Sequence, residues 1–177
     1  MKKICVISSL TCASLMLMAC EASTGAQEEV SYPIKSTQGA EIGTLSLKTL
    51  NSGGVNVKVD ISGISPGLHA MHFHEIGRCD TPDFKSSGGH YNPLEVAHGQ
   101  VEDGPHAGDM MNVEANADGK GAFVVTNKDV SLRGGDLPAL MDADGTALII
   151  HAGPDDYKSQ PSGAAGPRIA CAVIPAG

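Results

Sequence analysis

The stretch Val55-Asn-Val-Lys-Val-Asp-Ile61 alternates apolar and polar side chains with a period of two. This alternation is typical of a half-buried β-strand. Leu45 and Leu47 alternate in the same way, and Asn51-Ser-Gly-Gly54 supplies a turn between the two strands. Further strands are expected around 123–126 and 147–150, each after an Asp-Gly turn. No segment keeps a period of 3.6, so the sequence predicts an all-β sandwich or flattened barrel with long loops.

Two long stretches, 76–110 and 154–166, have no strand character. Structureless loops of this length are uncommon inside a compact domain and usually carry function. The first stretch holds three of the seven histidines and one of the five cysteines. We therefore expect these loops to supply much of the functional site.

All seven histidines lie between His69 and His151, and six of them are spaced as metal ligands. His72 and His74 lie on one expected strand, where alternate residues share a face, so both imidazoles point the same way. The other candidate ligands are His90, His98, His106, Asp109 and His151. Six imidazoles and one carboxylate are enough for two first-row metal sites. Three imidazoles with a carboxylate suit tetrahedral zinc, whereas four imidazoles suit copper.

Residues 1–19 are expected to be a signal peptide. Lys2 and Lys3 precede a largely apolar run from Ile4 to Leu17, which is the layout of an export signal. The sequence Leu17-Met-Ala-Cys20 resembles the bacterial lipobox, whose cysteine is lipid-modified and becomes the first residue of the mature protein. The alternative is an ordinary signal peptide that contains a cysteine by chance.

The rest of the chain reads as a tether followed by one domain. Residues 21–29 contain no sizeable apolar side chain, so segment 20–29 is expected to be a flexible tether from a lipidated Cys20. Residues 30–177 show no repeat or boundary and suit a single domain with a sizeable core. No second apolar stretch is long enough to span a membrane, so the lipid on Cys20 is the only membrane contact that we expect.

The charge balance excludes one class of partner. The full chain has a formal net charge of −8, and loss of the two signal lysines would leave ten basic residues against twenty acidic ones. Nucleic acid binding depends on basic patches, so we expect no nucleic acid partner. An anionic substrate would have to be drawn in by local positive charge.

Two cysteines remain in the expected domain, Cys79 and Cys171. An even pair in an exported protein can persist as a disulfide, because the compartment is oxidising. The alternative is a pair of unpaired, buried thiols.

Five motifs resemble the copper,zinc superoxide dismutase family. They are Gly67-Leu-His-Ala-Met-His-Phe-His-Glu75, Gly89-His-Tyr-Asn-Pro93, Gly104-Pro-His-Ala-Gly-Asp109, Ala147-Leu-Ile-Ile-His-Ala-Gly153 and Gly166-Pro-Arg-Ile-Ala-Cys171. The resemblance runs in order from Val30 to the C-terminus. It implies a Greek-key β-sandwich or flattened barrel of the immunoglobulin-like kind, with metal-binding and channel loops.

The resemblance also implies an activity, which is dismutation of superoxide to dioxygen and hydrogen peroxide through a Cu(II)/Cu(I) cycle. One copper and one structural zinc are expected per subunit. The implied copper ligands are His72, His74, His90 and His151, and the implied zinc ligands are His90, His98, His106 and Asp109. His90 would bridge the two metals through its two ring nitrogens.

Four further residues take roles from the same resemblance. Arg168 matches the arginine that lies beside copper and attracts superoxide. Asp155 matches the carboxylate that links a copper-site histidine to a zinc-site histidine, and Cys79 and Cys171 match the family disulfide. His69 is expected to be a hydrogen-bonded packing residue, and Lys158 is either a second attracting charge or a solvated surface lysine.

Several positions depart from the pattern that is common in the family without removing a ligand. They are Ala70, Met71, Met111, Ser162, Ala164 and Ala172. We expect them to affect loop rigidity and rate rather than the presence of the activity.

Three other functions are compatible with metal binding. A copper-binding or chaperone-like domain would be expected to lack a copper ligand or Arg168. A zinc hydrolase needs an open zinc position, and a surface adhesin with structural metals would have no use for Arg168. The complete set of matching residues favours the dismutase.

The expected location is the periplasmic side of a bacterial cell envelope, where the enzyme would protect against oxidative damage. Glu21 rather than aspartate follows Cys20, so the inner-membrane retention signal of the enteric sorting rule is absent. The outer membrane is therefore the favoured site of the anchor. A homodimer is possible, since both monomers and dimers occur among bacterial relatives.

Overall fold

The computed structural model describes residues 27–177, which form nine strands and one short 3-10 turn. The predicted signal peptide, the lipobox with Cys20 and most of the predicted tether lie outside these residues. The elements are β1 (Glu29–Ser36), β2 (Glu41–Thr49), β3 (Val55–Ser62), β4 (Gly67–His69), β5 (Met71–His74), η1 (Lys85–Ser87), β6 (Val113–Ala115), β7 (Lys120–Asn127), β8 (Thr146–His151) and β9 (Arg168–Ile174).

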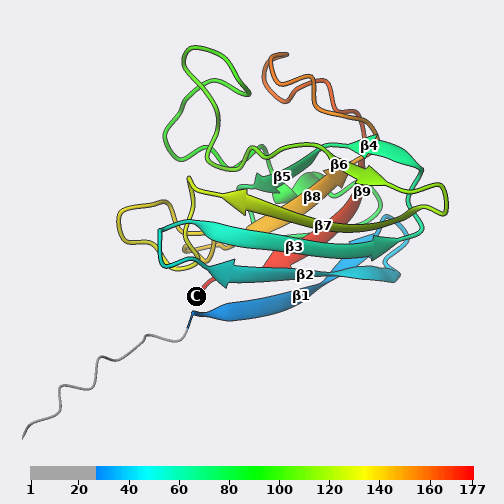
Figure 1. The fold of residues 1–177 in the computed structure, drawn as a ribbon, viewed down its shortest axis with the longest axis horizontal. Helices are drawn as coiled ribbons and strands as arrows, with labels where there is room; N and C mark the ends of the chain where they lie inside the picture. The colour runs from blue at the N-terminus through cyan, green and yellow to red at the C-terminus, as the bar shows by residue number, and fades with distance from the viewer. Residues whose placement is uncertain (1–26) are drawn as a thin grey trace, which may run out of the picture.

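Seven of the strands form one antiparallel sheet in the order β5-β8-β9-β1-β2-β3-β7. A small second sheet pairs β4 with β6. The large sheet curls into a half-barrel, with β7 and β3 on one side of the core and β8 and β9 on the other (Figure 1). The predicted all-β class is confirmed, and among residues 27–177 the only helical element has three residues.

The strand that decides the fold class forms as predicted. In β3, Val55, Val57 and Val59 are fully buried, whereas Lys58 and Asp60 face solvent and form an ion pair of 2.9 Å. β3 pairs with β2 on one side and with β7 on the other. Its buried valines therefore face the core from inside the sheet rather than from an edge strand.

Strand β8 is buried on both faces, which explains why its sequence is apolar without alternation. Leu148 and Ile150 point into the main core, which also contains the apolar faces of β1, β2, β3 and β7. Ala147 and Ile149 point to the opposite face, where they pack with Phe84 and Cys171 in a second, smaller cluster.

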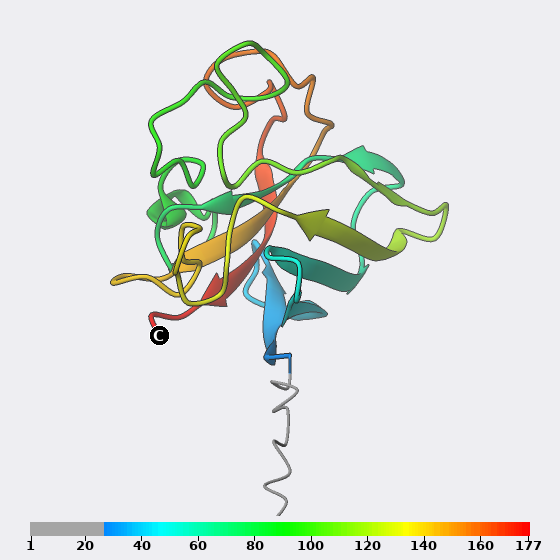
Figure 2. The ribbon, with the colours of Figure 1, turned by 60° about the vertical axis from the view of Figure 1, so that its left-hand side comes forward.

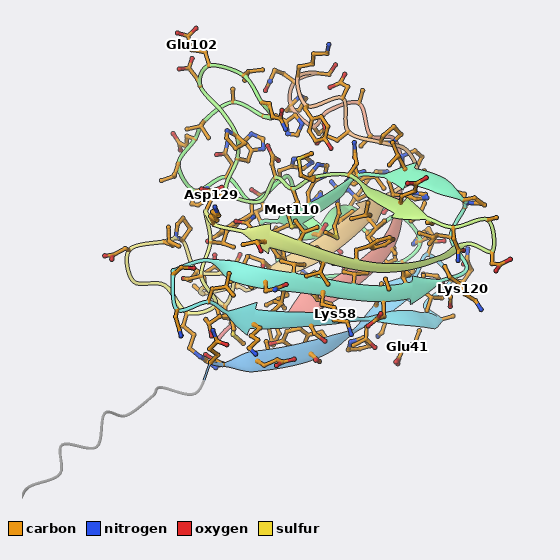
Figure 3. The ribbon with its side chains drawn as sticks, viewed as in Figure 1. Glu41, Lys58, Glu102, Met110, Lys120 and Asp129 are labelled. Atoms are coloured by element: carbon orange, nitrogen blue, oxygen red, sulfur yellow. A yellow bond between two sulfur atoms is a disulfide. The ribbon has the colours of Figure 1, made fainter. Side chains whose placement is uncertain are left out.

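The two long stretches without strand character are loops, as predicted. One runs from β5 to β6 and the other from β8 to β9, and both lie on the same side of the molecule, above the sheet (Figures 1 and 2). Figure 3 places Glu102 at the tip of the first loop, far from Lys58 and Lys120 on the sheet. We call these segments the first loop (75–112) and the second loop (152–167). Within residues 27–177, no helix is both long and apolar enough to cross a membrane.

Candidate metal centre

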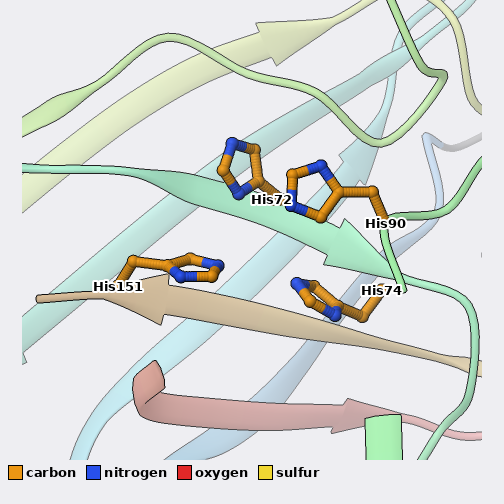
Figure 4. Close-up of side chains that lie close together, drawn as sticks. All are labelled: His72, His74, His90 and His151. Atoms are coloured by element: carbon orange, nitrogen blue, oxygen red, sulfur yellow. The ribbon is translucent and has the colours of Figure 1, made fainter. Parts of the chain in front are cut away.

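Strands β5 and β8 supply three of the six candidate imidazoles. Alternation along β5 turns Phe73 into the main core and leaves His72 and His74 on the outer face of the sheet, as predicted. The neighbouring β8 ends at His151, after a register shift between Ile150 and His151. The three rings therefore converge from two paired strands (Figure 4). All three are buried, because the two loops cover this face.

The first loop is fixed against the free edge of β5 by backbone hydrogen bonds. Phe73 donates its N–H to the carbonyl of Gly108 at 2.9 Å and accepts from the N–H of Tyr91 at 2.8 Å. Isolated bridges join His74 to His90 and His72 to Asp109. Gly108 permits this approach, because a Cβ there would lie 2.6 Å from the Phe73 carbonyl oxygen. The edge of the strand thus brings the loop ligands to the strand ligands.

Four imidazoles form one group, whose ligand atoms lie within 4.8 Å of one another: His72, His74, His90 and His151. In three of them a hydrogen bond fixes the tautomer. His74 Nδ1 donates to the Gly88 carbonyl at 3.0 Å, His151 Nδ1 donates to the Gly166 carbonyl at 3.0 Å, and His72 Nε2 donates to Asp155 at 2.8 Å.

The remaining ring nitrogens of this group are buried and have no hydrogen-bond partner: His72 Nδ1, His74 Nε2, His90 Nε2 and His151 Nε2. Buried polar atoms without partners are costly and rare. Four such nitrogens that converge on one point fit a metal ion, and a set of four imidazoles without a thiolate suits copper.

Three imidazoles and a carboxylate form the second group, also with ligand atoms within 4.8 Å of one another: His90, His98, His106 and Asp109. Asp109 Oδ1 lies 3.0 Å from His90 Nδ1 and 3.4 Å from His106 Nδ1. The other carboxylate oxygen, Oδ2, accepts the backbone N–H of Gly99 at 2.9 Å and of His106 at 3.1 Å. His98 Nδ1 lies 3.0 Å from Oδ2 but is not aligned for a hydrogen bond. This donor set suits tetrahedral zinc.

His90 is the only residue that the two groups share. Its Nδ1 faces Asp109, whereas its Nε2 is the unpartnered atom of the four-imidazole group. The centroids of the His90 and His72 rings are 4.0 Å apart. One imidazole therefore offers a nitrogen to each group.

Asp155 in the second loop links the two groups through hydrogen bonds to one histidine of each. Its carboxylate accepts hydrogen bonds from His72 Nε2 at 2.8 Å and from His98 Nε2 at 3.1 Å. Its backbone is held by Asn112, which donates to the Asp155 carbonyl at 2.9 Å and accepts from its N–H at 2.8 Å. The carboxylate thus orients both rings and leaves the Nδ1 atom of each for a metal.

Three imidazoles of the copper group and the carboxylate of the zinc group have lowered pKa values. Desolvation lowers the pKa of His72 to about 4, of His151 to about 3 and of His74 to about 2. For Asp109 burial raises the pKa, but the hydrogen bonds from His90 and the Gly99 N–H outweigh it and hold the pKa at about 2. These three imidazoles are therefore neutral and the carboxylate ionised, as metal binding requires.

Arg168 lies beside the four-imidazole group at the start of β9. Its Nη1 donates to the Phe84 carbonyl at 2.8 Å and to Ser87 Oγ at 3.1 Å, and its Nη2 donates to the Gly88 carbonyl at 2.7 Å. The guanidinium opens onto a cleft of about 590 Å³ whose lining includes His74, His90 and His151. Ser162 also lines this cleft, whereas Lys158 is exposed and lies outside its lining.

Cys79 and Cys171 form a disulfide with a Cα–Cα distance of 5.8 Å, so the alternative of unpaired thiols is wrong. His69 is buried and its Nδ1 donates to the His151 carbonyl at 2.7 Å, and it belongs to neither ligand group.

Sequence reasoning missed several residues that hold the site. Gly88 and Gly166 act through backbone carbonyls, and a single sequence carries no signal for that role. Gln160 was also missed, although its side chain accepts from the His98 N–H and donates to the His98 carbonyl, both at 2.9 Å. Asn112 directly precedes a strand and follows the last zinc-group ligand closely, but one chain alone gives no reason to single it out.

Comparison with known proteins agrees with this geometry. Residues 41–174 match the family described as copper/zinc superoxide dismutase. A Cu-Zn superoxide dismutase 1 from Aquifex aeolicus is 47% identical over 143 residues, which cover 80% of this chain and 84% of that protein. The chain belongs to the copper/zinc superoxide dismutase family.

Two solved structures share the fold. A SOD-like protein from Bacillus subtilis has a TM-score of 0.78 at 36% identity, covering 81% of this chain and 97% of that chain. A Cu/Zn superoxide dismutase from Brucella abortus has a TM-score of 0.67 at 29% identity, covering 83% of this chain and 99% of that chain.

The predicted family, enzyme class and metals are therefore confirmed, with a histidine copper site and a histidine–aspartate zinc site both complete. The zinc hydrolase is disfavoured, because four protein side chains already fill a tetrahedral zinc site. A domain that merely binds copper is disfavoured, because the copper group has all four imidazoles.

Proposed function

We propose that this enzyme removes superoxide outside the cytoplasm, with Arg168 drawing the anion to the copper group and His90 linking the two metals. The observation that carries the proposal is the cleft in which Arg168 meets His74, His90 and His151. Bound copper would supply the one-electron chemistry, cycling between Cu(II) and Cu(I), and bound zinc would hold structure without redox work.

Within residues 27–177 Arg168 forms no ion pair, so its charge can act on an anion in the cleft, although the nearby carboxylates of Asp83 and Glu75 partly offset that charge. Its hydrogen-bond acceptors are two backbone carbonyls and one hydroxyl. Among the residues that the structure describes, no carboxylate lies within 4.0 Å of its guanidinium. The net charge of the chain is −8, so this local cation must act against an unfavourable overall field.

Asp155 and His90 each have a separate role in the proposed function. Asp155 keeps His72 and His98 in the orientation and tautomer that leave each Nδ1 free. His90 lines the cleft, and its buried Nε2, when no metal holds it, can carry a proton to a reduced oxygen species. The cleft supplies the path between this nitrogen and solvent.

The direct test is to load the protein with copper and zinc and to follow superoxide decay by pulse radiolysis. A large acceleration over buffer is expected. If both metals are bound and the decay is no faster than in buffer, the proposed function is wrong.

The disulfide indicates an extracytoplasmic protein, because structural disulfides persist in oxidising compartments. The finer part of the proposal is a lipid on Cys20 that anchors the enzyme to the outer membrane of the cell envelope. Fractionation of the producing cells tests it: Cys20→Ala should move the enzyme from the membrane fraction to the soluble periplasmic fraction. A wild-type enzyme that is already soluble would remove the anchor from the proposal.

We also propose that the enzyme can form a homodimer, in which exposed apolar side chains such as Leu68, Met111 and Val124 would be available for burial. Sedimentation equilibrium over a range of concentrations tests this point, and a monomer mass at every concentration would contradict it.

A further inference from the structure

One buried residue of the first loop has a backbone conformation that is unusual for its type. Phe84 has φ 55° and ψ 20°, in the left-handed region. A bulky residue rarely adopts this conformation, and it persists only where surrounding contacts hold it. Those contacts are present, because the Phe84 side chain is fully buried.

The Phe84 ring anchors its part of the loop to the sheet. It packs in the smaller apolar cluster with Ala147 and Ile149 of β8 and with Cys171 of β9, and the half-buried Cys79 lies against the same cluster. Of the side chains in residues 76–89, Phe84 is the only fully buried apolar one. The segment therefore has one apolar anchor besides its disulfide.

Two backbone carbonyls, those of Phe84 and Gly88, accept hydrogen bonds from the Arg168 guanidinium and form the cradle that holds it. The Phe84 carbonyl is one half of this cradle. It accepts a hydrogen bond from Arg168 Nη1 at 2.8 Å, and it also accepts from the Ser87 N–H at 3.1 Å and from Ser87 Oγ at 2.9 Å. The other half is the Gly88 carbonyl, which accepts from Arg168 Nη2 at 2.7 Å and from the copper-group ligand His74 at 3.0 Å.

We propose that Phe84 is a positioning residue: its buried ring holds the 84–88 turn so that two carbonyls aim the Arg168 guanidinium into the cleft. The inference rests on the role proposed above for Arg168. A planar guanidinium with a fixed fork of donors is oriented by acceptors placed at the right positions. A fixed orientation of this kind lowers the cost of receiving an anion.

The disulfide alone does not account for the position of the carbonyl. Cys79 and Phe84 are separated by residues 80–83, which are all exposed. The Phe84 N–H donates to the Asp80 carbonyl at 3.0 Å, but this bond lies within the same exposed segment. The far end of the turn is tied to the residues that follow β5, because Ile76 and Glu75 donate their N–H groups to the Ser87 and Gly89 carbonyls, both at 3.1 Å. At the Phe84 end, the side chain that packs against β8 and β9 is the Phe84 ring itself.

Three variants test the inference: Phe84→Ala, which removes the anchor, Phe84→Leu, which keeps much of its volume, and Arg168→Ala as the reference. Phe123→Ala is the matched control, because Phe123 is a buried phenylalanine of the main core on β7, at the other end of the sheet. The first measurement is the affinity of the copper- and zinc-loaded proteins for azide, a small anionic probe, at matched metal content.

We expect Phe84→Ala to bind azide about tenfold more weakly, so that its affinity approaches that of Arg168→Ala. The reason is that the charge-assisted hydrogen bond from Arg168 to azide depends on the orientation of the guanidinium. Phe84→Leu should bind nearly as wild type. Phe123→Ala should lower the melting temperature and leave azide affinity unchanged. Should Phe84→Ala not fold, Phe84→Val also loses ring volume and disfavours the left-handed conformation, and it should weaken binding in the same direction.

The second measurement needs no metal. The guanidinium protons of Arg168 in the metal-free protein should exchange slowly with water in wild type and Phe84→Leu, and rapidly in Phe84→Ala, as followed by NMR. If Phe84→Ala keeps wild-type azide affinity and slow exchange, the inference is wrong. If Arg168→Ala itself leaves azide affinity unchanged, the proposed role of Arg168 fails, and the exchange rates alone decide whether Phe84 positions the side chain.

Discussion

Acidification of the metal-free protein should lower its free energy of unfolding by about 6 kcal/mol between about pH 7.5 and about pH 5. The cause is the burial of three imidazoles of the copper group, His72, His74 and His151, which are at most 5% exposed. Burial lowers their pKa values to about 4, 2 and 3, respectively. In the unfolded chain the pKa of each returns to about 6.5.

The sign follows from proton binding. Below about pH 6.5 the unfolded chain takes up protons that the folded protein excludes, so stability falls as the pH falls. The loss continues until the folded protein also binds protons, which begins at about pH 4 with His72. At about pH 5 each histidine contributes about 2 kcal/mol, or about 1.5 pH units at 1.36 kcal/mol each. Asp109, whose pKa is lowered to about 2, contributes stability that is lost only below its ordinary value of 3.8.

A total of about 6 kcal/mol is comparable with the whole stability of a typical domain. Urea unfolding of the metal-free protein at the two pH values, followed by circular dichroism, measures it. His74→Leu is the control, because loss of one titrating group should reduce the pH-dependent loss by about a third. An equal urea midpoint at both pH values, or an undiminished loss in His74→Leu, would refute the reasoning. The metal-loaded protein should resist acid further, since protons must then displace metals.

Four substitutions test other parts of the site. Arg168→Ala should lower the rate and weaken its dependence on ionic strength at unchanged metal content; loss of copper instead would contradict the assigned role. Gly163→Ala should weaken copper and zinc binding by about 10–100-fold in chelator competition, because a Cβ at this left-handed glycine would overlap the Asp155 carboxylate. Gly63→Ala is its control, since that glycine is also left-handed, has open space around it and lies outside both loops. Gln160→Ala should release zinc about fivefold faster to a chelator, because two hydrogen bonds to the His98 backbone are lost. An unchanged release rate would show that these two hydrogen bonds are not needed to retain zinc. Cys171→Ser should cost about 4–5 kcal/mol in urea unfolding, since the disulfide closes a loop with a sequence separation of 92; a loss below about 1 kcal/mol would contradict the chain-entropy argument.

The fold could be predicted largely from local patterns. The alternation in β3 identified the strand and its buried face, because side chains on a strand alternate with a period of two. The same rule placed His72 and His74 on one face. The absence of strand character in 76–110 and 154–166 located both loops.

The arrangement of the loops over the sheet could not be predicted in this way. Gln160 contacts the backbone of His98 across 62 positions, and Arg168 contacts Phe84 across 84. Contacts between residues so far apart in the sequence produce no pattern that can be recognised in it. In each of these contacts one partner uses only its backbone atoms, which every residue possesses. The ligand sets followed from a family resemblance, whereas the hydrogen bonds that choose each ring nitrogen required coordinates.

The start of the first strand illustrates a smaller difference. β1 begins at Glu29, one residue before the expected start of the domain at Val30. Glu28 also accepts hydrogen bonds from Arg133 at 2.8–3.1 Å, so the end of the predicted tether is tied to the loop before β8. A charged residue next to a strand gave no hint of this partner.

The backbone bonds that hold the first loop against Phe73 also cover an open edge of the sheet. β5 is the last strand of the large sheet, and its outer N–H and C=O groups would otherwise be free to pair with another chain. The segments that cover this edge, around Tyr91 and Gly108, are adjacent to His90 and Asp109, so the zinc group holds the cover in place. Bound zinc is therefore expected to protect this strand edge from pairing with another chain, in addition to completing the metal centre.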